Sequence, residues 1–249
     1  MVDFMSVMIL PTDSGSDDER QFGLAFGEAQ TVEKLDHVVE RHRGVFRSLA
    51  EFVAADNELV VVVGNHDVEF HFPAVQRRFV EQLCRLLPAE VAEASTARIR
   101  FCPWFYYEEE RVYVEHGHQY DEYCSFDYQL HPVDGKGDVA LSIAHAGIRY
   151  FTNLVPSIDP GVVEHWGFVD YLRWAFQQGA RTLLAIFYFY GVFVWKALSW
   201  WSSLTDRAAD AARGELHRQQ LLALAEDLKI AAEQLHALDE LRRVPVIKR

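Results

Sequence analysis

Two short stretches of this sequence combine side chains that can bind metals and transfer protons. The first is Asn65-His66-Asp67, and the second is His116-Gly117-His118, with Asp121 shortly after it. An amide oxygen suits a hard divalent cation, and an imidazole can bind a metal or transfer a proton near neutral pH. These residue types indicate metal-assisted acid–base chemistry, and an ordinary polar loop at either place is the alternative interpretation.

Each stretch follows a segment with the pattern of a β-strand. The four valines at positions 60–63 have no helical period and a high β propensity. Residues 111–115 alternate in the way of a half-buried strand. Gly64 then allows a sharp turn after the first of these strands. Because open α/β sheets usually place their sites at the carboxyl ends of strands, we expect the two stretches to lie together.

The block Gly64-Asn65-His66-Asp67 matches the Gly-Asn-His-Asp/Glu block of the calcineurin-like metallophosphoesterases, which this sequence resembles. The resemblance implies that Asn65 ligates a metal and that His66 acts on the leaving oxygen or the phosphoryl group as an acid or electrophile. A histidine after a later strand ligates the same metal in that family, which makes His116 the second candidate ligand. Three more residues are candidates for contacting the substrate or supporting the metal ligands: Asp67, His118 and Asp121.

Val2-Asp3-Phe4 resembles the end of an earlier family block, Gly-Asp-x-x-Asp. The resemblance implies that the Asp3 carboxylate hydrogen-bonds His66, which fixes the tautomer of the imidazole and raises the basicity of its other nitrogen. An ordinary turn contact of Asp3 is the alternative. The family's Asp-x-His block and its terminal Gly-His-x-His block are not found, since Tyr120 stands where the second histidine of the latter would be. The resemblance covers roughly residues 1–130, and we expect the chain to be a fragment of such an enzyme.

The activity that this resemblance implies is metal-dependent hydrolysis of a phosphate ester or a pyrophosphate bond. It implies two divalent ions about 3.5–4 Å apart that activate a hydroxide in an intact relative. Nitrogen and oxygen ligands do not distinguish manganese from iron, zinc or nickel. The alternative is a catalytically inactive domain of the same kind that binds a partner or a membrane.

Composition limits the choice of partner and compartment. The chain has 249 residues, of which 50% are hydrophobic, and a formal net charge of -13. We expect no nucleic-acid binding because phosphate backbones need a basic surface, but a phosphorylated small molecule or lipid-linked substrate is compatible with a bound metal. Three cysteines without close pairing and the lack of an amino-terminal signal pattern predict a cytoplasmic protein, and association with a membrane is compatible with this location.

The predicted fold class is α/β, with a mixed β-sheet flanked by helices as in metallophosphoesterases. We assign residues 1–138 to a partial phosphoesterase domain and residues 139–249 to an aromatic-rich helical insertion or cap. For Glu69 and His71, close behind the first stretch, we expect ordinary loop roles, and a place in the lining of the pocket is the alternative. The sequence pattern predicts helices over residues 31–55 and 73–87 and a further strand over residues 98–104.

The helical part contains an uninterrupted apolar run over residues 183–195. We expect a buried or interfacial helix that contacts a membrane peripherally through residues 183–201, and a membrane span over residues 183–204 is the alternative. Caps of this kind engage lipid-linked substrates in some members of the family. A single helix is predicted over residues 206–243, because leucines and one alanine recur there at steps of three and four and form a short heptad seam.

Overall fold

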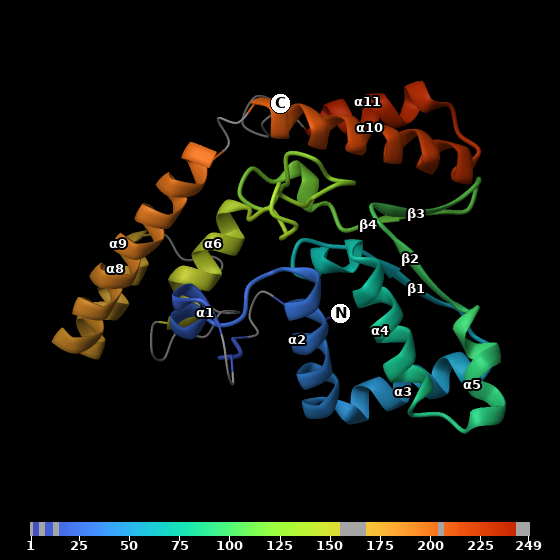
Figure 1. The fold of residues 1–249 in the computed structure, drawn as a ribbon, viewed down its shortest axis with the longest axis horizontal. Coiled ribbons are helices and arrows are strands. Elements are labelled where there is room, and N and C mark those ends of the chain that lie inside the picture. Colours follow the sequence, from blue (N-terminus) through green and yellow to red (C-terminus); the bar gives the residue numbers. More distant parts are fainter. Residues whose placement is uncertain (1, 5–7, 12–14, 155–167, 204–206, 243–249) are drawn as a thin grey trace. The chain divides into compact units, whose positions relative to one another are not determined.

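The structure, a computed structural model, describes residues 2–4, 8–11, 15–154, 168–203 and 207–242. The chain divides into two compact units (Figure 1). The first unit comprises residues 1–4, 25–140 and 211–249, and the second comprises residues 5–24 and 141–210. The segment that we assigned to a helical cap, residues 139–249, is therefore divided between the two units, and residues 211–249 belong with the unit that carries both polar stretches.

The first unit contains helices and two small sheets, so the α/β class is confirmed at this level. Figure 1 labels its elements. They are α2 (Glu28–Arg41), α3 (Arg43–Ala54), β1 (Leu59–Val62), η1 (Val68–His71), α4 (Pro73–Cys84), α5 (Ala89–Thr96), β2 (Ile99–Cys102), β3 (Phe105–Glu108), β4 (Val112–Glu115), η2 (His118–Tyr120), α10 (Arg207–Leu228) and α11 (Ala232–Arg242).

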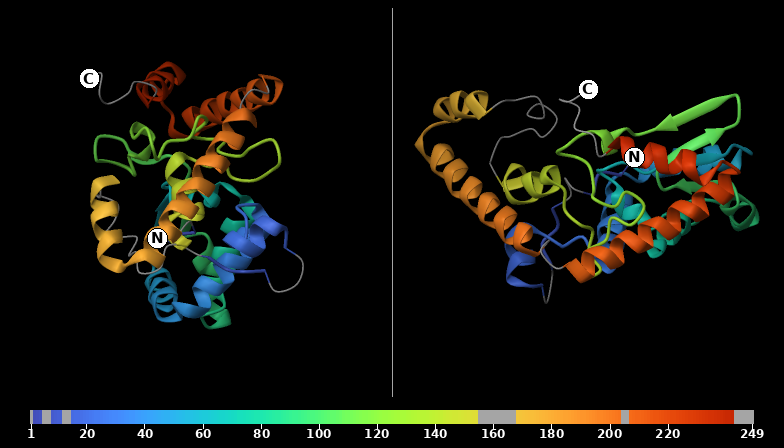
Figure 2. Two further views of the ribbon diagram at one scale, coloured as in Figure 1. Left: turned by 90° about the vertical axis from the view of Figure 1, so that its left-hand side faces the viewer. Right: turned by 90° about the horizontal axis from the view of Figure 1, so that it is seen from above.

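Two strand pairs carry the two polar stretches. Strands β1 and β2 run parallel, with Leu59 opposite Ile99 and Val62 opposite Cys102. Strands β3 and β4 form an antiparallel ribbon, which Figure 2 shows, with Phe105 opposite Glu115. The strands predicted over residues 60–63, 98–104 and 111–115 are thus confirmed, with the second ending earlier than predicted. Within the part of the chain that the structure describes, the sheets have two strands each.

Helices α2 to α5 pack against one another (Figure 1). The apolar face of α2 and α3 is the predicted one, since Leu35, Phe46 and Val53 are buried. The prediction of one helix over residues 31–55 is wrong, because His42 leaves the helical conformation at φ -113° and ψ 31° and separates α2 from α3. The helix predicted over residues 73–87 is present as α4, with Pro73 in its first turn.

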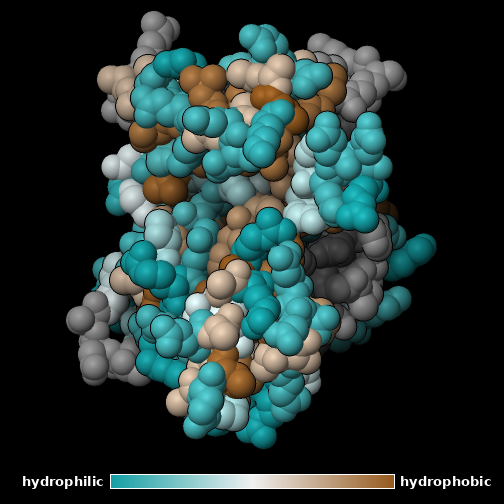
Figure 3. All heavy atoms as spheres, turned by 90° about the vertical axis from the view of Figure 1, so that its right-hand side faces the viewer, coloured by the Kyte–Doolittle hydropathy of each residue, from teal (hydrophilic) through white to brown (hydrophobic). Residues whose placement is uncertain are grey.

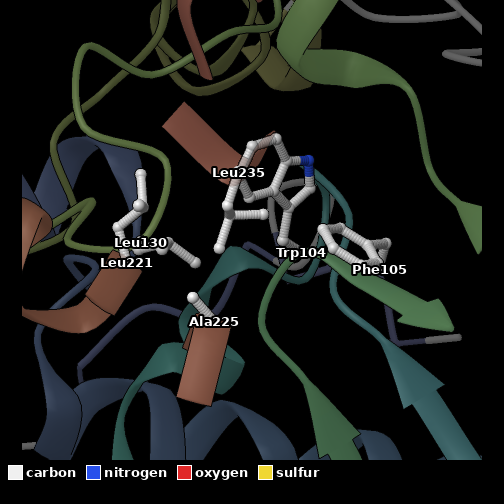
Figure 4. Packing of buried hydrophobic residues seen from close by; sticks show 6 residues of the cluster. All are labelled: Trp104, Phe105, Leu130, Leu221, Ala225 and Leu235. Atoms are coloured by element: carbon white, nitrogen blue, oxygen red, sulfur yellow. The ribbon is translucent and has the colours of Figure 1, made fainter. Parts of the chain in front are cut away.

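Helices α10 and α11 close a hydrophobic cluster of the first unit. Figure 4 shows Leu221, Ala225 and Leu235 from these helices packed with Trp104, Phe105 and Leu130. The prediction of a single helix over residues 206–243 is wrong, because Lys229 adopts a left-handed conformation with φ 55° and the chain turns there. The apolar seam is therefore shared by two helices that both pack on the core of this unit.

The second unit is helical in the residues described. Its elements are α1 (Asp17–Phe22), α6 (Ile143–Tyr150), η3 (Thr152–Leu154), α8 (Phe168–Gln178) and α9 (Ala180–Ser203). Phe22, Ala146 and Tyr150 form one cluster, with Val192 of α9 packed against it. The carboxylate of Asp18 forms ion pairs with both Arg149 and Lys196. These ion pairs connect α1, α6 and α9.

The apolar run over residues 183–195 forms the middle of α9. No helix within the described ranges has both the length and the apolarity that crossing a membrane requires. Several large apolar side chains of α9 are exposed, namely Leu184, Phe187, Tyr188, Tyr190, Trp195 and Leu198. In Figure 3, which colours residues by hydropathy, hydrophobic and hydrophilic residues alternate in small groups on the face in view.

Candidate active site

The first polar stretch forms a tight loop after β1. The Gly64 N–H donates a 2.7 Å hydrogen bond to Oδ1 of Asp67, which closes the loop on itself. Asn65 and Asp67 are buried, whereas the side chain of His66 keeps 22% of its surface exposed. The Val63 N–H also donates to the carbonyl of Cys102, which fixes the loop to the end of β2. The loop thus presents His66 outward from a backbone that several hydrogen bonds hold.

Asp3 and His66 are in contact, as the sequence predicts. Oδ2 of Asp3 lies 3.0 Å from Nδ1 of His66. The backbone reinforces this pair, because the Phe4 N–H donates a 2.9 Å hydrogen bond to the His66 carbonyl. The Phe4 ring is fully buried and packs edge-on against Phe70 at a centroid distance of 5.6 Å. Residues 2–4 therefore place a carboxylate on one nitrogen of His66.

His116 lies against the first loop. A Cβ atom added to Gly64 would come within 2.5 Å of Cδ2 and 2.8 Å of Nε2 of His116. Glycine is the residue that leaves room for this imidazole, which explains why the motif begins with one. The contact brings the ends of β1 and β4 together, so the expected meeting of the two polar stretches is present. His116 is exposed on its other side.

The remaining residues of the second stretch have different surroundings. His118 is buried, its Nε2 lies 3.1 Å from Oε1 of Gln129, and its ring lies 5.2 Å from the ring of His116. It therefore supports the wall of the site next to His116. Asp121 is exposed, and its Oδ1 accepts hydrogen bonds from the N–H groups of Tyr123 and Cys124. The interactions of Asp121 are local to its own turn.

Burial shifts the pKa values of several groups around His66. It raises the pKa of Asp67 to about 6, although the Gly64 N–H acts in the opposite direction. It lowers the pKa of His116, and the nearby His66 lowers it further. Burial likewise lowers the pKa of His118 to about 3. The imidazoles of His116 and His118 are thus neutral at pH 7, which is the form that binds a metal through nitrogen.

Sequence reasoning missed two buried ionisable residues beside this loop, Glu69 and Lys34. Glu69, expected to have an ordinary loop role, is completely buried, and within the described residues neither carboxylate oxygen has a hydrogen-bond partner. Burial raises its pKa to about 8, while Lys34 acts to lower it. Lys34 on α2 is itself 1% exposed, and its ammonium lies 4.1 Å from the centre of the Phe26 ring. One feature of the sequence does indicate that Lys34 is buried. It lies on the apolar face of its helix, between Thr31 and Leu35.

The described residues contain no group of three His, Cys, Asp or Glu side chains arranged to hold a metal ion. The donors that the sequence predicts, the Asn65 amide and the His116 imidazole, belong to adjoining loops because Gly64, next to Asn65, touches His116. An amide oxygen and a neutral imidazole are compatible ligands for manganese, iron, zinc or nickel. The structure thus places the two predicted donors on adjoining loops, which follow β1 and β4.

Comparison with known proteins gives no relative for this chain. No protein-family model matches it, and neither the curated proteins nor the solved structures contain a match.

Proposed function

We propose that this protein is a metal-dependent hydrolase of phosphate ester or pyrophosphate bonds, built like the calcineurin-like metallophosphoesterases around β1 and its loop. The observation that carries the proposal is the Asp3–His66 pair, with 3.0 Å between Oδ2 and Nδ1, located where His116 closes on Gly64. A carboxylate, an oriented imidazole, an amide and a second imidazole in adjoining loops are the groups that phosphoryl transfer from a metal-bound phosphate needs.

In this proposal His66 is the catalytic residue and Asp3 positions it. The Asp3 carboxylate accepts a hydrogen bond from Nδ1 of His66, so Nε2 is the nitrogen that would face a phosphoryl oxygen or a leaving oxygen. When His66 is protonated, the same carboxylate stabilises the imidazolium, which favours donation of a proton to the departing alkoxide. Asp67 acts on the backbone, since its Oδ1 holds the Gly64 N–H and thereby the shape of the loop.

Asn65 and His116 are the residues that would hold a divalent cation. Such an ion supplies charge neutralisation for the phosphate and lowers the pKa of a water molecule that attacks phosphorus. Two protein donors leave several positions of a manganese or magnesium ion to water and phosphate oxygens, which is the usual coordination of such ions in phosphoryl-transfer sites. His118, buried against Gln129, keeps the wall behind His116 in place.

For the substrate we propose a phosphorylated small molecule or a lipid-linked phosphate. The support for a lipid is the exposed apolar surface of α9, which includes Phe187, Tyr188 and Trp195. Aromatic side chains of this kind partition into the interface of a bilayer. The cysteines Cys84 and Cys102 are free, which supports a reducing compartment such as the cytoplasm. In this proposal α9 is in peripheral contact with a membrane.

The test is hydrolysis of p-nitrophenyl phosphate and of its bis-ester in the presence of manganese. We expect His66→Ala to lower kcat by about 100-fold or more, the usual contribution of a general acid. His116→Ala should raise the manganese concentration required for activity. The matched control is His37→Ala, which removes an exposed histidine of α2. Activity that survives both substitutions would refute this site, and a folded wild-type chain without activity on either ester would favour the inactive, partner-binding alternative.

A further inference from the structure

Strand β4 forms one edge of the antiparallel ribbon that Figure 2 shows. Its partner β3 also contacts β1, so the edge of β3 faces the parallel pair. Among the described residues, no backbone hydrogen bond joins β4 to any segment other than β3. Alternate N–H and C=O groups of an edge strand point away from its partner. The free edge of β4 therefore offers backbone groups that can pair with a further strand.

The centre of β4 is apolar and exposed. Val112, Tyr113 and Val114 are 39%, 45% and 46% exposed, and all three residue types favour strands. Proteins usually protect a free edge with a proline or a lysine, and residues 111–115 contain neither. This edge thus lacks the side chains that prevent addition of another strand.

The ribbon is held in shape by its turn and by its packing. The Arg111 N–H donates a 3.0 Å hydrogen bond to the Glu108 carbonyl, and Glu110 adopts a left-handed conformation with φ 57°. Phe105 of β3 belongs to the buried cluster closed by α10 and α11, and its ring lies 5.1 Å from that of Tyr113. The edge of β4 is therefore preformed, and pairing with another strand requires little ordering of the chain.

Opposite charges stand at the two ends of this edge. Arg111 precedes β4 with a side chain that is 74% exposed, and Nη1 of its guanidinium lies 2.5 Å from Oε1 of Glu108, which leaves donors on its other nitrogens. Glu115 ends β4, and its Oε2 accepts hydrogen bonds from the Tyr113 hydroxyl at 2.7 Å and the Gln119 amide at 2.6 Å. A strand with a positive charge at one end and a negative charge at the other is complementary to an antiparallel copy of itself.

We propose that β4 pairs antiparallel with β4 of a second copy of this chain, with Tyr113 of each copy opposite the other at a two-fold axis. In this register Arg111 of each copy lies opposite Glu115 of the other, and Val112 lies opposite Val114. Every such pair occurs twice, as in any isologous interface. The two ribbons become one four-stranded sheet, which is more stable than an isolated two-stranded ribbon. The proposal uses none of the residues assigned to catalysis or metal binding, so it is independent of the proposed hydrolase activity.

The experiment is sedimentation of the full chain from about 10 μM to about 1 mM, in about 0.15 M salt so that the net charge of -13 is screened. We expect a dimer with a Kd in the micromolar range or above, because a short strand pair buries less than the roughly 1,200 Å² of a standard interface. Arg111→Glu should weaken the dimer about tenfold or more, since it places two like-charged pairs across the axis. A wild type that stays monomeric throughout, or an Arg111→Glu variant that dimerises like the wild type, overturns the proposal.

A charge exchange tests whether the two residues meet between copies. Glu115→Arg alone should also be monomeric, whereas a mixture of Arg111→Glu and Glu115→Arg should form a heterodimer, because each opposed pair then again combines a positive and a negative charge. The matched control is Arg218→Glu on α10, which changes the net charge by the same amount at another exposed arginine and should dimerise like the wild type. Two folded variants that remain monomeric when mixed contradict the proposed register.

Cross-linking tests the same register even if Glu115→Arg does not fold. Opposed residues of an antiparallel pair have Cα atoms about 4.5–5.5 Å apart, a distance that a disulfide spans. Tyr113→Cys should therefore form a covalent dimer with a copper–phenanthroline oxidant, whereas Val112→Cys, whose own copy lies two residues along the strand, should not. The wild type, which contains Cys84, Cys102 and Cys124, measures the background. Equal cross-linking of Tyr113→Cys and Val112→Cys, or of Tyr113→Cys and wild type, overturns the proposal.

Discussion

The carboxylate of Asp3 and the imidazole of His66, which come from distant parts of the chain, meet with Oδ2 3.0 Å from Nδ1. The Phe4 N–H and the His66 carbonyl add a backbone hydrogen bond beside this contact. The backbone hydrogen bond restricts the positions that the two side chains can adopt. The carboxylate and the imidazole are therefore held in a fixed relative orientation. In the proposed function this geometry directs His66 as an acid or base, and that role can be tested directly.

Replacement of Asp3 by asparagine should lower kcat/KM for phosphate esters by about 10- to 100-fold, the usual cost of losing an oriented carboxylate behind a functional histidine. The reason is that an amide does not stabilise the imidazolium of His66. The fold should persist because the backbone bond of Phe4 remains. The measurement is a pH–rate profile of both proteins, in which the limb that reports His66 should shift to lower pH in the variant.

The matched control for Asp3→Asn is Asp121→Asn, because Asp121 is exposed and its carboxylate bonds only to its own turn in the interactions that we describe. Its activity should equal that of the wild type. A pH profile of Asp3→Asn that superimposes on the wild-type profile would show that the Asp3–His66 contact has no part in the chemistry.

Gly64 is expected to tolerate no side chain while His116 is present. A Cβ atom at this position would lie 2.5 Å from Cδ2 of His116, so Gly64→Ala should cost roughly 1–3 kcal/mol in the free energy of unfolding, as overpacking does elsewhere. The double variant Gly64→Ala/His116→Ala should recover most of that loss, because the clashing ring is gone. Chemical denaturation of the four proteins in this cycle measures the coupling.

Gly44→Ala provides the comparison, since a Cβ atom there would meet nothing within 4 Å and the residue lies in α3. This substitution should stabilise the protein by about 0.5–1 kcal/mol. If Gly64→Ala costs as much with His116 as without it, the contact between the two loops is absent in solution.

Glu69 should make the protein less stable as the pH rises. Burial raises its folded pKa to about 8 from an ordinary value of 4.5, so between these pH values the folded state holds a proton that the unfolded state has lost. Stability due to this group is complete below about pH 4.5 and declines as the pH increases to 8. Glu69→Gln should therefore be the more stable protein above pH 8, by about 1 kcal/mol or more.

The free energy of unfolding of Glu69→Gln and wild type, measured from pH 5 to pH 9, checks this expectation. The difference should shrink toward the acid end of the range. Glu33→Gln, on the exposed face of α2, should show no such trend. A constant difference across the range would mean that Glu69 is ionised at neutral pH, paired with Lys34 or another cation.

The exposed aromatic side chains of α9 should bind lipid surfaces. Trp195 and Tyr188 are 72% and 58% exposed, so replacing both by serine should reduce co-sedimentation with phospholipid vesicles several-fold, while α9 stays anchored through Lys196 and Asp18. Vesicles with and without anionic lipid separate an apolar from a charge-driven contact. Phe52→Ser on α3 removes a comparably exposed ring in the other unit and should not affect binding. If all three proteins sediment equally with the vesicles, the aromatic side chains of α9 do not contribute to membrane binding.

The sequence predicts those parts of the structure that local patterns determine. Four consecutive valines gave the position of β1, and Pro73 the start of α4. The Asp3–His66 contact and the approach of His116 were predictable because a motif specifies which residues meet. The helix breaks at His42 and Lys229 were not predictable, because neither residue type is a strong helix breaker.

Buried charges were the other part that sequence reasoning did not reach. Lys34 and Arg213 have apolar neighbours one helical turn away, but periodicity alone does not tell whether a long cationic side chain reaches solvent or folds inward. Glu69 follows a motif that drew attention to its neighbours and carries no signal of its own. These residues depend on which distant segments cover them, and that information comes only from the tertiary structure.

The most direct test of the proposed function is calorimetric titration of the protein with manganese chloride. If the Asn65 amide and the His116 imidazole share one cation, the wild type should bind manganese, and Asn65→Ala and His116→Ala should each weaken binding by about tenfold or more. The exposed-histidine control His37→Ala should bind like the wild type. Equal manganese affinity in all four proteins, or no binding by the wild type, would contradict the metal site on which the proposed hydrolysis depends.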